Sequence, residues 1–189
     1  MALNRFSLAG ALVLAMLVSL TSGTVRAQEL PSLGSAPSFQ FTDSTGQQFD
    51  SNSLRGTVWI LSFFFTNCPA ICPAIQGRVA GLYKLFDGER DFRIVSISVD
   101  PGNDTPEKLA EYARTFEADP KRWIFLTGED EAVKRVAREG FKLNPGETPE
   151  QHNTRVVLVD KDYQIRGYFQ GTEAEGVNRL RASVRSLLP

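Results

Sequence analysis

Residues 58–73 read VWILSFFFTNCPAICP, and this stretch decides the fold. Its first half, residues 58–65, is a nearly unbroken apolar and aromatic run, which is typical of a β-strand buried on both faces. The run stops at Thr66 and Asn67, and two cysteines follow at once. Pro73 suits the first position of a helix, where a missing N–H costs nothing. Apolar residues then recur at helical spacing: Ile75, Val79, Leu82 and Phe86.

Strands and helices alternate along the rest of the chain. A threonine followed by a proline, Thr105 and Pro106, indicates the start of a second helix. The pattern predicts one domain, residues 38–189, with an α/β fold: a thioredoxin-like sandwich with an N-terminal hairpin extension. We expect the hairpin over residues 39–49, strands over 92–99, 123–127, 156–159 and 165–169, and further helices over 129–138 and 177–188.

Residues 1–27 resemble a signal peptide. Arg5 precedes an apolar run over residues 8–20, and residues 25–27 read VRA, which fits cleavage after Ala27. The alternative is an uncleaved membrane anchor, although the apolar run is short against the roughly 20 residues of a bilayer span. In both cases we expect an exported, periplasmic protein, either soluble or anchored by this segment. Residues 28–37 are polar with Pro and Gly and are expected to form a flexible lead-in.

The charge balance excludes some classes of partner. The whole chain has 21 basic and 22 acidic residues; without Arg5 and Arg26 it has 19 basic residues, for a net charge of −3. No basic block is present, so we expect no nucleic-acid partner. No second apolar run is long enough to span a membrane, so contact with a membrane is expected only through an uncleaved leader.

The residues able to bind a soft metal are few. Both methionines lie in the leader, and the rest of the chain has only Cys68, Cys72 and His152. The cysteines follow a buried strand and open a helix, whose positive end favours thiolates. His152 precedes the strand at 156–159, and in a thioredoxin-like sandwich that loop faces the cysteines. Two thiolates and an imidazole suit Cu(I), and Cu(II) with an added oxygen ligand, whereas zinc would need a fourth ligand.

Other interpretations of these residues stay open at this point. The cysteines could form a structural disulfide, or a reversible one in a thiol–disulfide oxidoreductase that acts on a partner's cysteines. His152 could be an exposed loop histidine. A papain-like hydrolase does not fit, because the sequence offers no third residue that would orient the histidine. A peroxiredoxin does not fit either, because the spacing around Thr66 differs from its motif.

Four segments together resemble the Sco/SenC family. They are the CPxxCP-type motif over residues 65–73, SVDP with DTP over 98–106, Trp123 with LTG over 126–128, and His152 ahead of VLVD over 157–160. They occur in family order, and the resemblance covers roughly residues 36–188.

The resemblance implies a thioredoxin fold that binds copper through Cys68, Cys72 and His152. It further implies a copper chaperone, rather than an enzyme, that delivers copper to the dinuclear centre of cytochrome c oxidase, or that reduces thiols there. The implied partners are the copper-bearing oxidase subunit, a thioredoxin-like reductant and another copper chaperone.

This chain departs from the family pattern at two places. Many members have an acid where it has Ala70, and the usual Asp-His-Ser is Gln-His-Asn over residues 151–153. Residues around a metal ligand orient it, so affinity and redox potential depend on these positions. Asp100 and Asp104 match the family, and we expect them to shape the turn and cap the following helix.

Overall fold

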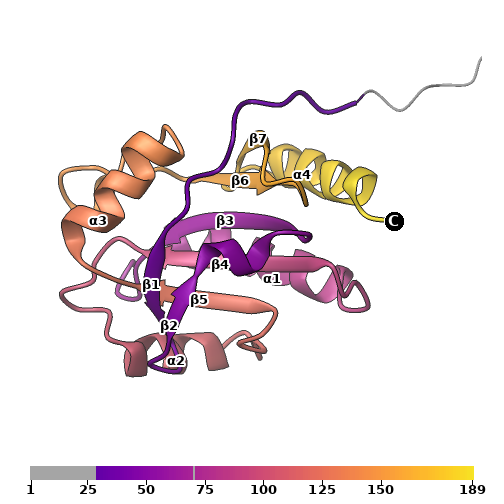
Figure 1. Cartoon of the computed structure of the whole chain (residues 1–189). Helices are drawn as coiled ribbons and strands as arrows, with labels where there is room; N and C mark the ends of the chain where they lie inside the picture. The colour runs from indigo at the N-terminus through magenta and orange to yellow at the C-terminus, as the bar shows by residue number, and fades with distance from the viewer. Residues whose placement is uncertain (1–28, 70) are drawn as a thin grey trace, which may run out of the picture.

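The computed structural model describes residues 29–69 and 71–189, which form a seven-stranded mixed sheet with helices packed on it (Figure 1). The predicted leader, residues 1–27, lies outside the described residues. The strands are β1 (Gln40–Asp43), β2 (Gln48–Asp50), β3 (Val58–Phe64), β4 (Phe92–Ser98), β5 (Trp123–Thr127), β6 (Arg155–Val159) and β7 (Ile165–Gln170). The helices are α1 (Ile71–Leu85), α2 (Pro106–Arg114), α3 (Asp130–Arg135) and α4 (Ala174–Leu187), with short 3-10 or π turns at Ser51–Leu54, Val136–Gly140 and Pro149–Gln151.

The sheet has the strand order β2-β1-β5-β4-β3-β6-β7. Strands β3, β4 and β5 are parallel to one another, while β6 and β7 form an antiparallel hairpin beside β3. The β1–β2 hairpin joins the other side through antiparallel pairing of β1 with β5. The predicted α/β sandwich with an N-terminal hairpin is therefore confirmed.

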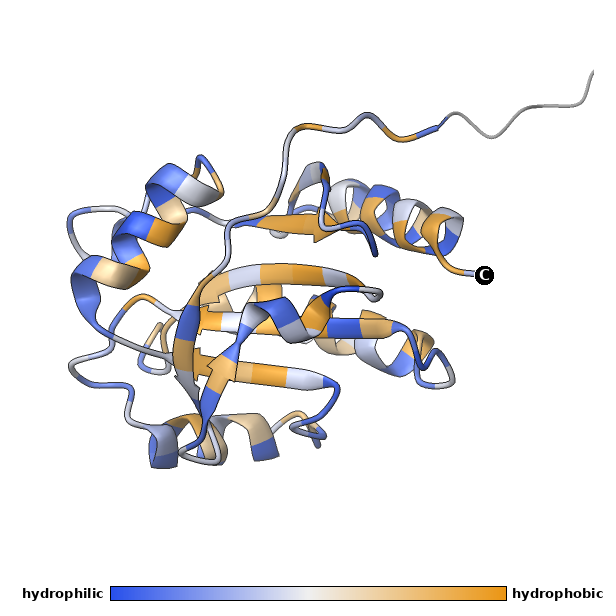
Figure 2. Ribbon diagram, in the orientation of Figure 1, coloured by the Kyte–Doolittle hydropathy of each residue, from blue (hydrophilic) through white to orange (hydrophobic). Residues whose placement is uncertain are grey.

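Strand β3 lies in the centre of the core. All of its residues are buried, and Figure 2 shows the central strands as predominantly hydrophobic, whereas the helices alternate in hydropathy along their length. Helices cover the sheet, so apolar side chains on both faces of β3 are removed from water, which explains the unbroken apolar run in the sequence. This central position fixes where the carboxyl end of β3 delivers the cysteine motif.

Helix α1 begins two residues earlier than the sequence predicts. Its first helical residue is Ile71, so Pro73 occupies the third position and not the first. The first N–H groups of a helix have no partner inside the helix, and a proline is therefore tolerated throughout the first turn. The earlier start places Cys72 inside the helix, while Cys68 stays in the preceding loop.

The expected flexible lead-in is in part hydrogen-bonded to the domain. Leu33 N–H donates to Ile165 O at 2.8 Å, and Ile165 N–H donates to Gly34 O at 2.8 Å, so this segment runs antiparallel to the start of β7. The outer edge of β7 has no other strand of the described sheet beside it, and its backbone groups need partners. The segment supplies them.

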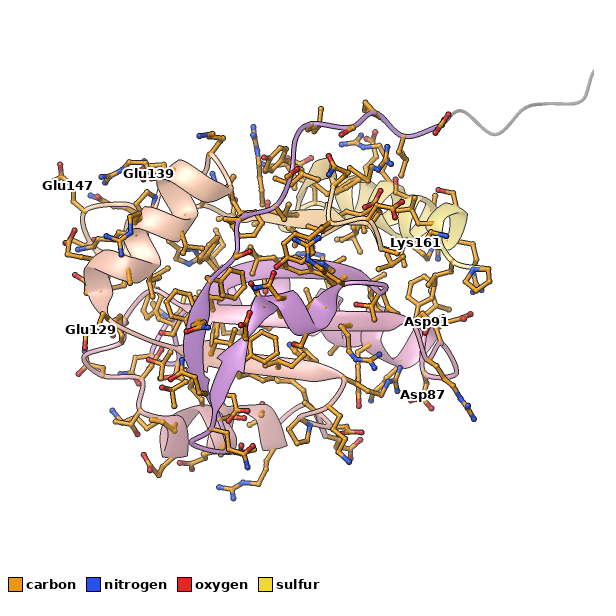
Figure 3. The ribbon with its side chains drawn as sticks, in the orientation of Figure 1. Asp87, Asp91, Glu129, Glu139, Glu147 and Lys161 are labelled. Carbon is orange, nitrogen blue, oxygen red and sulfur yellow. The ribbon has the colours of Figure 1, made fainter. Side chains whose placement is uncertain are left out.

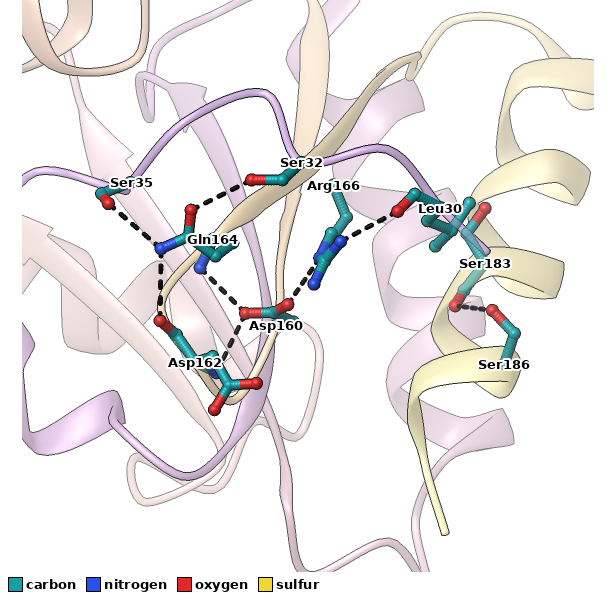
Figure 4. A network of polar contacts seen from close by, with 9 residues as sticks. All are labelled: Leu30, Ser32, Ser35, Asp160, Asp162, Gln164, Arg166, Ser183 and Ser186. Atoms are coloured by element: carbon teal, nitrogen blue, oxygen red, sulfur yellow. Dashed lines mark hydrogen bonds and ion pairs between the residues drawn. The ribbon is translucent and has the colours of Figure 1, made fainter. Parts of the chain in front are cut away.

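Side chains strengthen this attachment, as Figure 4 shows. Arg166 forms an ion pair with Asp160 at 2.5 Å and donates to Leu30 O at 2.9 Å. Asp160 is 3% exposed and also accepts from the backbone N–H groups of the turn between β6 and β7. Asp160 therefore joins the turn to the N-terminal segment through Arg166.

Within residues 29–69 and 71–189, no helix is both long and apolar enough to cross a bilayer.

Candidate metal centre

The two cysteines lie where β3 gives way to α1. Cys68 is in the loop of residues 65–69, here named the Cys68 loop, and Cys72 is the second residue of α1. Both are buried, and the structure has them as thiols, not joined in a disulfide. The backbone N–H of Cys72 donates to Cys68 Sγ at 3.2 Å. The helix start thus directs one of its N–H groups at a sulfur, which favours negative charge there.

His152 reaches this sulfur pair from a distant part of the sequence. It follows the 3-10 turn Pro149–Gln151, and its Nε2 lies 3.2 Å from Cys72 Sγ. The imidazole is 5% exposed and packs edge-on against Phe65, with 5.9 Å between ring centres. The interpretation as an exposed loop histidine is therefore wrong.

One hydrogen bond decides which nitrogen of His152 carries the proton. Nδ1 lies 2.9 Å from the backbone oxygen of Asn153. A carbonyl oxygen only accepts, so Nδ1 must be the donor, and Nε2 keeps a lone pair that points at Cys72 Sγ. This is the tautomer that a metal ligand requires.

The loop over residues 144–153, here named the His152 loop, is held by its own backbone. Asn153 N–H donates to Asn144 O at 3.2 Å and closes the loop, and Gly146 N–H donates to Asn144 Oδ1 at 3.1 Å. Gly146 has a φ of +79°, and a Cβ there would lie 2.8 Å from Gln151 C and from Thr148 O. The close approach requires glycine and fixes the turn that presents His152.

Burial keeps both facing groups neutral. It raises the pKa of the Cys72 thiol to about 12, with smaller contributions from the contact with Cys68 and from the charges of Cys68 and Asp104. Burial also lowers the pKa of His152 below its ordinary value, against the opposing effects of the Asn153 carbonyl and of Glu150. At neutral pH the pair is a thiol facing a neutral imidazole, so a metal that binds Cys72 must displace a proton.

The structure brings two of the three predicted residues into direct contact and the third close by. Among the described residues, no group of three or more His, Cys, Asp or Glu side chains is already arranged around a common point as a metal cage. Cys72 and His152 face each other, while Cys68 Sγ faces the start of α1. The donor set, two sulfurs and an imidazole nitrogen, suits copper.

Asp104 does not have its predicted role, and the contact made by Phe65 was not indicated by the sequence. Asp104 is not the cap of α2, because that role belongs to Thr105, whose Oγ1 accepts from Lys108 N–H at 3.4 Å. Asp100 shapes its turn as predicted, accepting from Asn103 Nδ2 at 3.0 Å. The sequence predicts Phe65 only as the end of a buried strand, and no local pattern indicates its contact with His152.

Three acidic side chains of the α3 region and the His152 loop, Glu129, Glu139 and Glu147, are exposed. Glu147, on the His152 loop, points away from the body in Figure 3, as do Glu129 and Glu139 at the two ends of the α3 region. Glu147 is therefore a suitable position for control substitutions that leave the buried contacts intact.

Comparison with known proteins identifies the family. The SCO1/SenC family model matches residues 28–188. The SCO1 protein homolog of Bacillus subtilis (strain 168) is 32% identical over 154 residues, which cover 78% of this chain and 80% of the relative.

Solved structures agree with this comparison. BsSco, described as a member of the Sco family of cytochrome c oxidase assembly proteins, superposes with a TM-score of 0.75 at 31% identity, over 85% of this chain and 97% of BsSco. ScoI of Arabidopsis thaliana with copper bound gives a TM-score of 0.68 at 26% identity, over 80% of this chain and 98% of ScoI. The thioredoxin-like fold is confirmed by these neighbours, and the chain belongs to the SCO1/SenC family.

Proposed function

We propose that this protein binds one copper ion through Cys68, Cys72 and His152 and delivers it to the dinuclear copper centre of cytochrome c oxidase. The observation that carries the proposal is the 3.2 Å approach of His152 Nε2 to Cys72 Sγ. A sulfur and a ring nitrogen from distant parts of the chain meet here in a buried place, with the nitrogen lone pair already turned inward. Two sulfurs and one imidazole make a soft three-coordinate site for Cu(I), and Cu(II) would take an added oxygen ligand.

His152 and Cys72 differ in whether a proton must leave before the metal binds. His152 needs no proton removed from Nε2, because the ring proton is on Nδ1 and is held by Asn153 O. Cys72 gives up its thiol proton to solvent when copper binds. Cys68 Sγ also turns from the Cys72 N–H toward the ion, a side-chain rotation within the loop that follows β3. Because the Cys72 thiol is protonated before the metal binds, the copper affinity depends on pH.

Delivery to the oxidase is supported by the relatives. BsSco is described as belonging to a family of cytochrome c oxidase assembly proteins, and ScoI of Arabidopsis thaliana has been solved with copper bound. From the leader-like sequence we propose that the protein acts outside the cytoplasm, in the periplasm. The proposed partners are the copper-bearing oxidase subunit, another copper chaperone as donor, and a thioredoxin-like reductant that keeps the cysteines reduced.

An anaerobic copper titration of the reduced protein tests the ligand set. The wild type is expected to bind one equivalent of Cu(I), measured by competition with bicinchoninate. Cys68→Ser, Cys72→Ser and His152→Ala should each lose most of the affinity, and Glu147→Gln should match the wild type. Equal affinity in His152→Ala and wild type would exclude the three-ligand site.

The alternative is a thiol–disulfide oxidoreductase. BsSco is described as having a disulfide switch, and this property of a similar protein supports a redox role for the cysteine pair. Burial works against Cys72 as the attacking group, because its pKa is raised to about 12 and the thiolate is the nucleophile. Cys68, 8% exposed against 1% for Cys72, would have to attack. Reduction of a disulfide substrate by His152→Ala at the wild-type rate, without copper, would favour this alternative.

A further inference from the structure

Asp104 is a buried carboxylate with no cation beside it. It is 0% exposed, and within the described part of the chain no Lys, Arg or His forms an ion pair with it. Removing a carboxylate from water is unfavourable unless hydrogen bonds replace the lost hydration. The burial of Asp104 therefore indicates a role other than shaping the turn.

Three donors surround the Asp104 carboxylate. Thr66 donates twice, from its backbone N–H to Oδ2 at 3.0 Å and from Oγ1 to Oδ1 at 2.5 Å. Ser98, the last residue of β4, donates from Oγ to Oδ2 at 2.5 Å. All three donate to one carboxyl group and replace the hydration that it loses on burial.

The network joins two segments that lie 38 residues apart in the sequence. Asp104 itself is fixed, because its N–H donates to Asp100 O at 2.9 Å and α2 begins two residues later. Thr66 opens the turn that presents Cys68, whose N–H donates to Phe65 O at 3.4 Å. The position of Cys68 thus depends on a contact made from the segment that follows β4.

We propose that Asp104 is a positioning residue for the copper site: its carboxylate fixes Thr66 and hence Cys68, and its negative charge favours Cu(II) over Cu(I) at the sulfurs. This inference rests on the copper binding proposed above. Two thiolates with Cu(I) have a net charge of −1, and with Cu(II) a net charge of zero. A nearby negative charge disfavours the more negative complex.

The charge of Asp104 acts at Cys72. After burial, the contact with Cys68 and the charge of Cys68, it is a smaller cause that raises the pKa of Cys72, and it acts in the same direction on the pKa of Tyr112. Positioning and charge are separate effects, and two substitutions together separate them.

Asp104→Asn isolates the charge. The amide oxygen can take the place of Oδ2 and keep accepting from Thr66 N–H and Ser98 Oγ, while the amide nitrogen takes the place of Oδ1 and donates to Thr66 Oγ1, whose hydroxyl turns away. The network can thus persist without the charge. The ratio of Cu(I) affinity to Cu(II) affinity is expected to rise several-fold. Cu(I) is measured against bicinchoninate, and Cu(II) against nitrilotriacetate, read immediately after anaerobic mixing.

Asp104→Ala removes the charge and the acceptor together, so its loss beyond that of Asp104→Asn reports the positioning. It leaves the half-buried Thr66 N–H without its acceptor, so both copper affinities are expected to fall by about tenfold or more. Thr66→Val removes only the hydroxyl and should give a smaller loss. The copper affinity of the double variant Thr66→Val/Asp104→Ala should equal that of Asp104→Ala alone, because Asp104→Ala already removes the hydrogen bond of the Thr66 hydroxyl.

Asp160→Asn is the matched control, since Asp160 is a buried, hydrogen-bonded carboxylate in the turn between β6 and β7. It should lower stability to urea without changing the affinity ratio. Wild-type affinities and ratio in both Asp104 variants, or the same ratio change in Asp160→Asn, would overturn the inference. If Asp104→Ala does not fold, Asp104→Asn and Thr66→Val decide the question. A wild type that binds no copper would refute the proposed function as well.

Discussion

Cys72 Sγ and His152 Nε2 lie 3.2 Å apart, although 80 residues separate them in the sequence. The sulfur is held by the first turn of α1, and the imidazole by a loop closed on its own backbone. Neither group faces water, and each is neutral because burial shifts its pKa toward the neutral form. The pair is already in contact in the proposed copper site, and its raised and lowered pKa values give the pH dependence predicted below.

Copper binding is expected to release protons. Because the pKa of Cys72 is raised to about 12, its thiol is protonated at neutral pH and must lose that proton to bind. Addition of Cu(I) to the reduced protein in a weak buffer should release at least the proton of the Cys72 thiol, and Cys72→Ser should release fewer protons than the wild type. The apparent affinity should therefore increase with pH. Release of no protons would mean that Cys72 is not a ligand.

The metal-free protein is expected to lose stability in alkali through Cys72. In the unfolded chain this thiol has its ordinary pKa of 9.0, whereas in the fold burial raises the pKa to about 12. The native state holds the proton more tightly, so the stabilisation is complete below about pH 9 and is lost as the pH rises toward 12. The full difference corresponds to about 4 kcal/mol.

Urea unfolding of the reduced wild type and of Cys72→Ser measures this contribution. Tyr112 and Tyr163, whose pKa values burial also raises, are present in both proteins and contribute to the loss of stability in alkali in each. Between about pH 8 and pH 11 the wild type should lose about 2 to 3 kcal/mol more than Cys72→Ser. Parallel curves for the two proteins would show that the thiol is not desolvated.

Gly146→Ala is expected to weaken copper binding without removing a ligand. A Cβ at this positive φ would meet Gln151 C and Thr148 O at 2.8 Å, both of which are backbone atoms of the His152 loop. Strain of about 1–3 kcal/mol would be relieved by moving the turn that presents His152. We expect the Cu(I) affinity to fall by about tenfold, with the proton release unchanged.

Gly102→Ala is the matched control for Gly146. Gly102 lies in the turn after β4, and a Cβ there would meet nothing within 4 Å. Its copper affinity should equal that of the wild type. If both variants bound copper as the wild type does, the His152 loop would be adjustable rather than fixed.

Two helical glycines should respond in opposite directions to alanine. A Cβ at Gly77 in α1 would meet nothing within 4 Å, so Gly77→Ala should stabilise the protein by about 0.5–1 kcal/mol through helix propensity. A Cβ at Gly176 in α4 would overlap Gln170 O, so Gly176→Ala should destabilise the protein by about 1–3 kcal/mol. Thermal unfolding measures both. Equal shifts in midpoint would mean that Gly176 does not lie close to Gln170 O.

Much of the fold follows from local patterns in the sequence. The unbroken apolar run of β3, the Thr105 cap with Pro106 behind it, and the hairpin around residues 43–46 each have a short-range physical cause, and each is present in the structure. The predicted start of α1 is wrong by two residues because a proline fits any position of the first helical turn.

Contacts between distant segments could not be predicted from local patterns in the sequence. The lead-in reads as a flexible segment because its composition is polar, yet the open edge of β7 binds its backbone through Leu33 and Gly34. Asp104 reads as a helix cap because it precedes Pro106 closely, yet its carboxylate reaches Thr66 on another segment. In both cases the partner lies far away in the sequence.

The sequence alone determined which residues could bind a soft metal, because the chain has only two cysteines and one histidine, and its two methionines, Met1 and Met16, lie far from them in the sequence. It also determined that the cysteines lie at the carboxyl end of a central strand, since apolar periodicity is a local property. Only the tertiary structure decided that His152 is buried against Cys72 with Nε2 facing the sulfur, and that Asp104 holds the Cys68 loop. Those contacts arise from packing between distant segments, which no local pattern encodes.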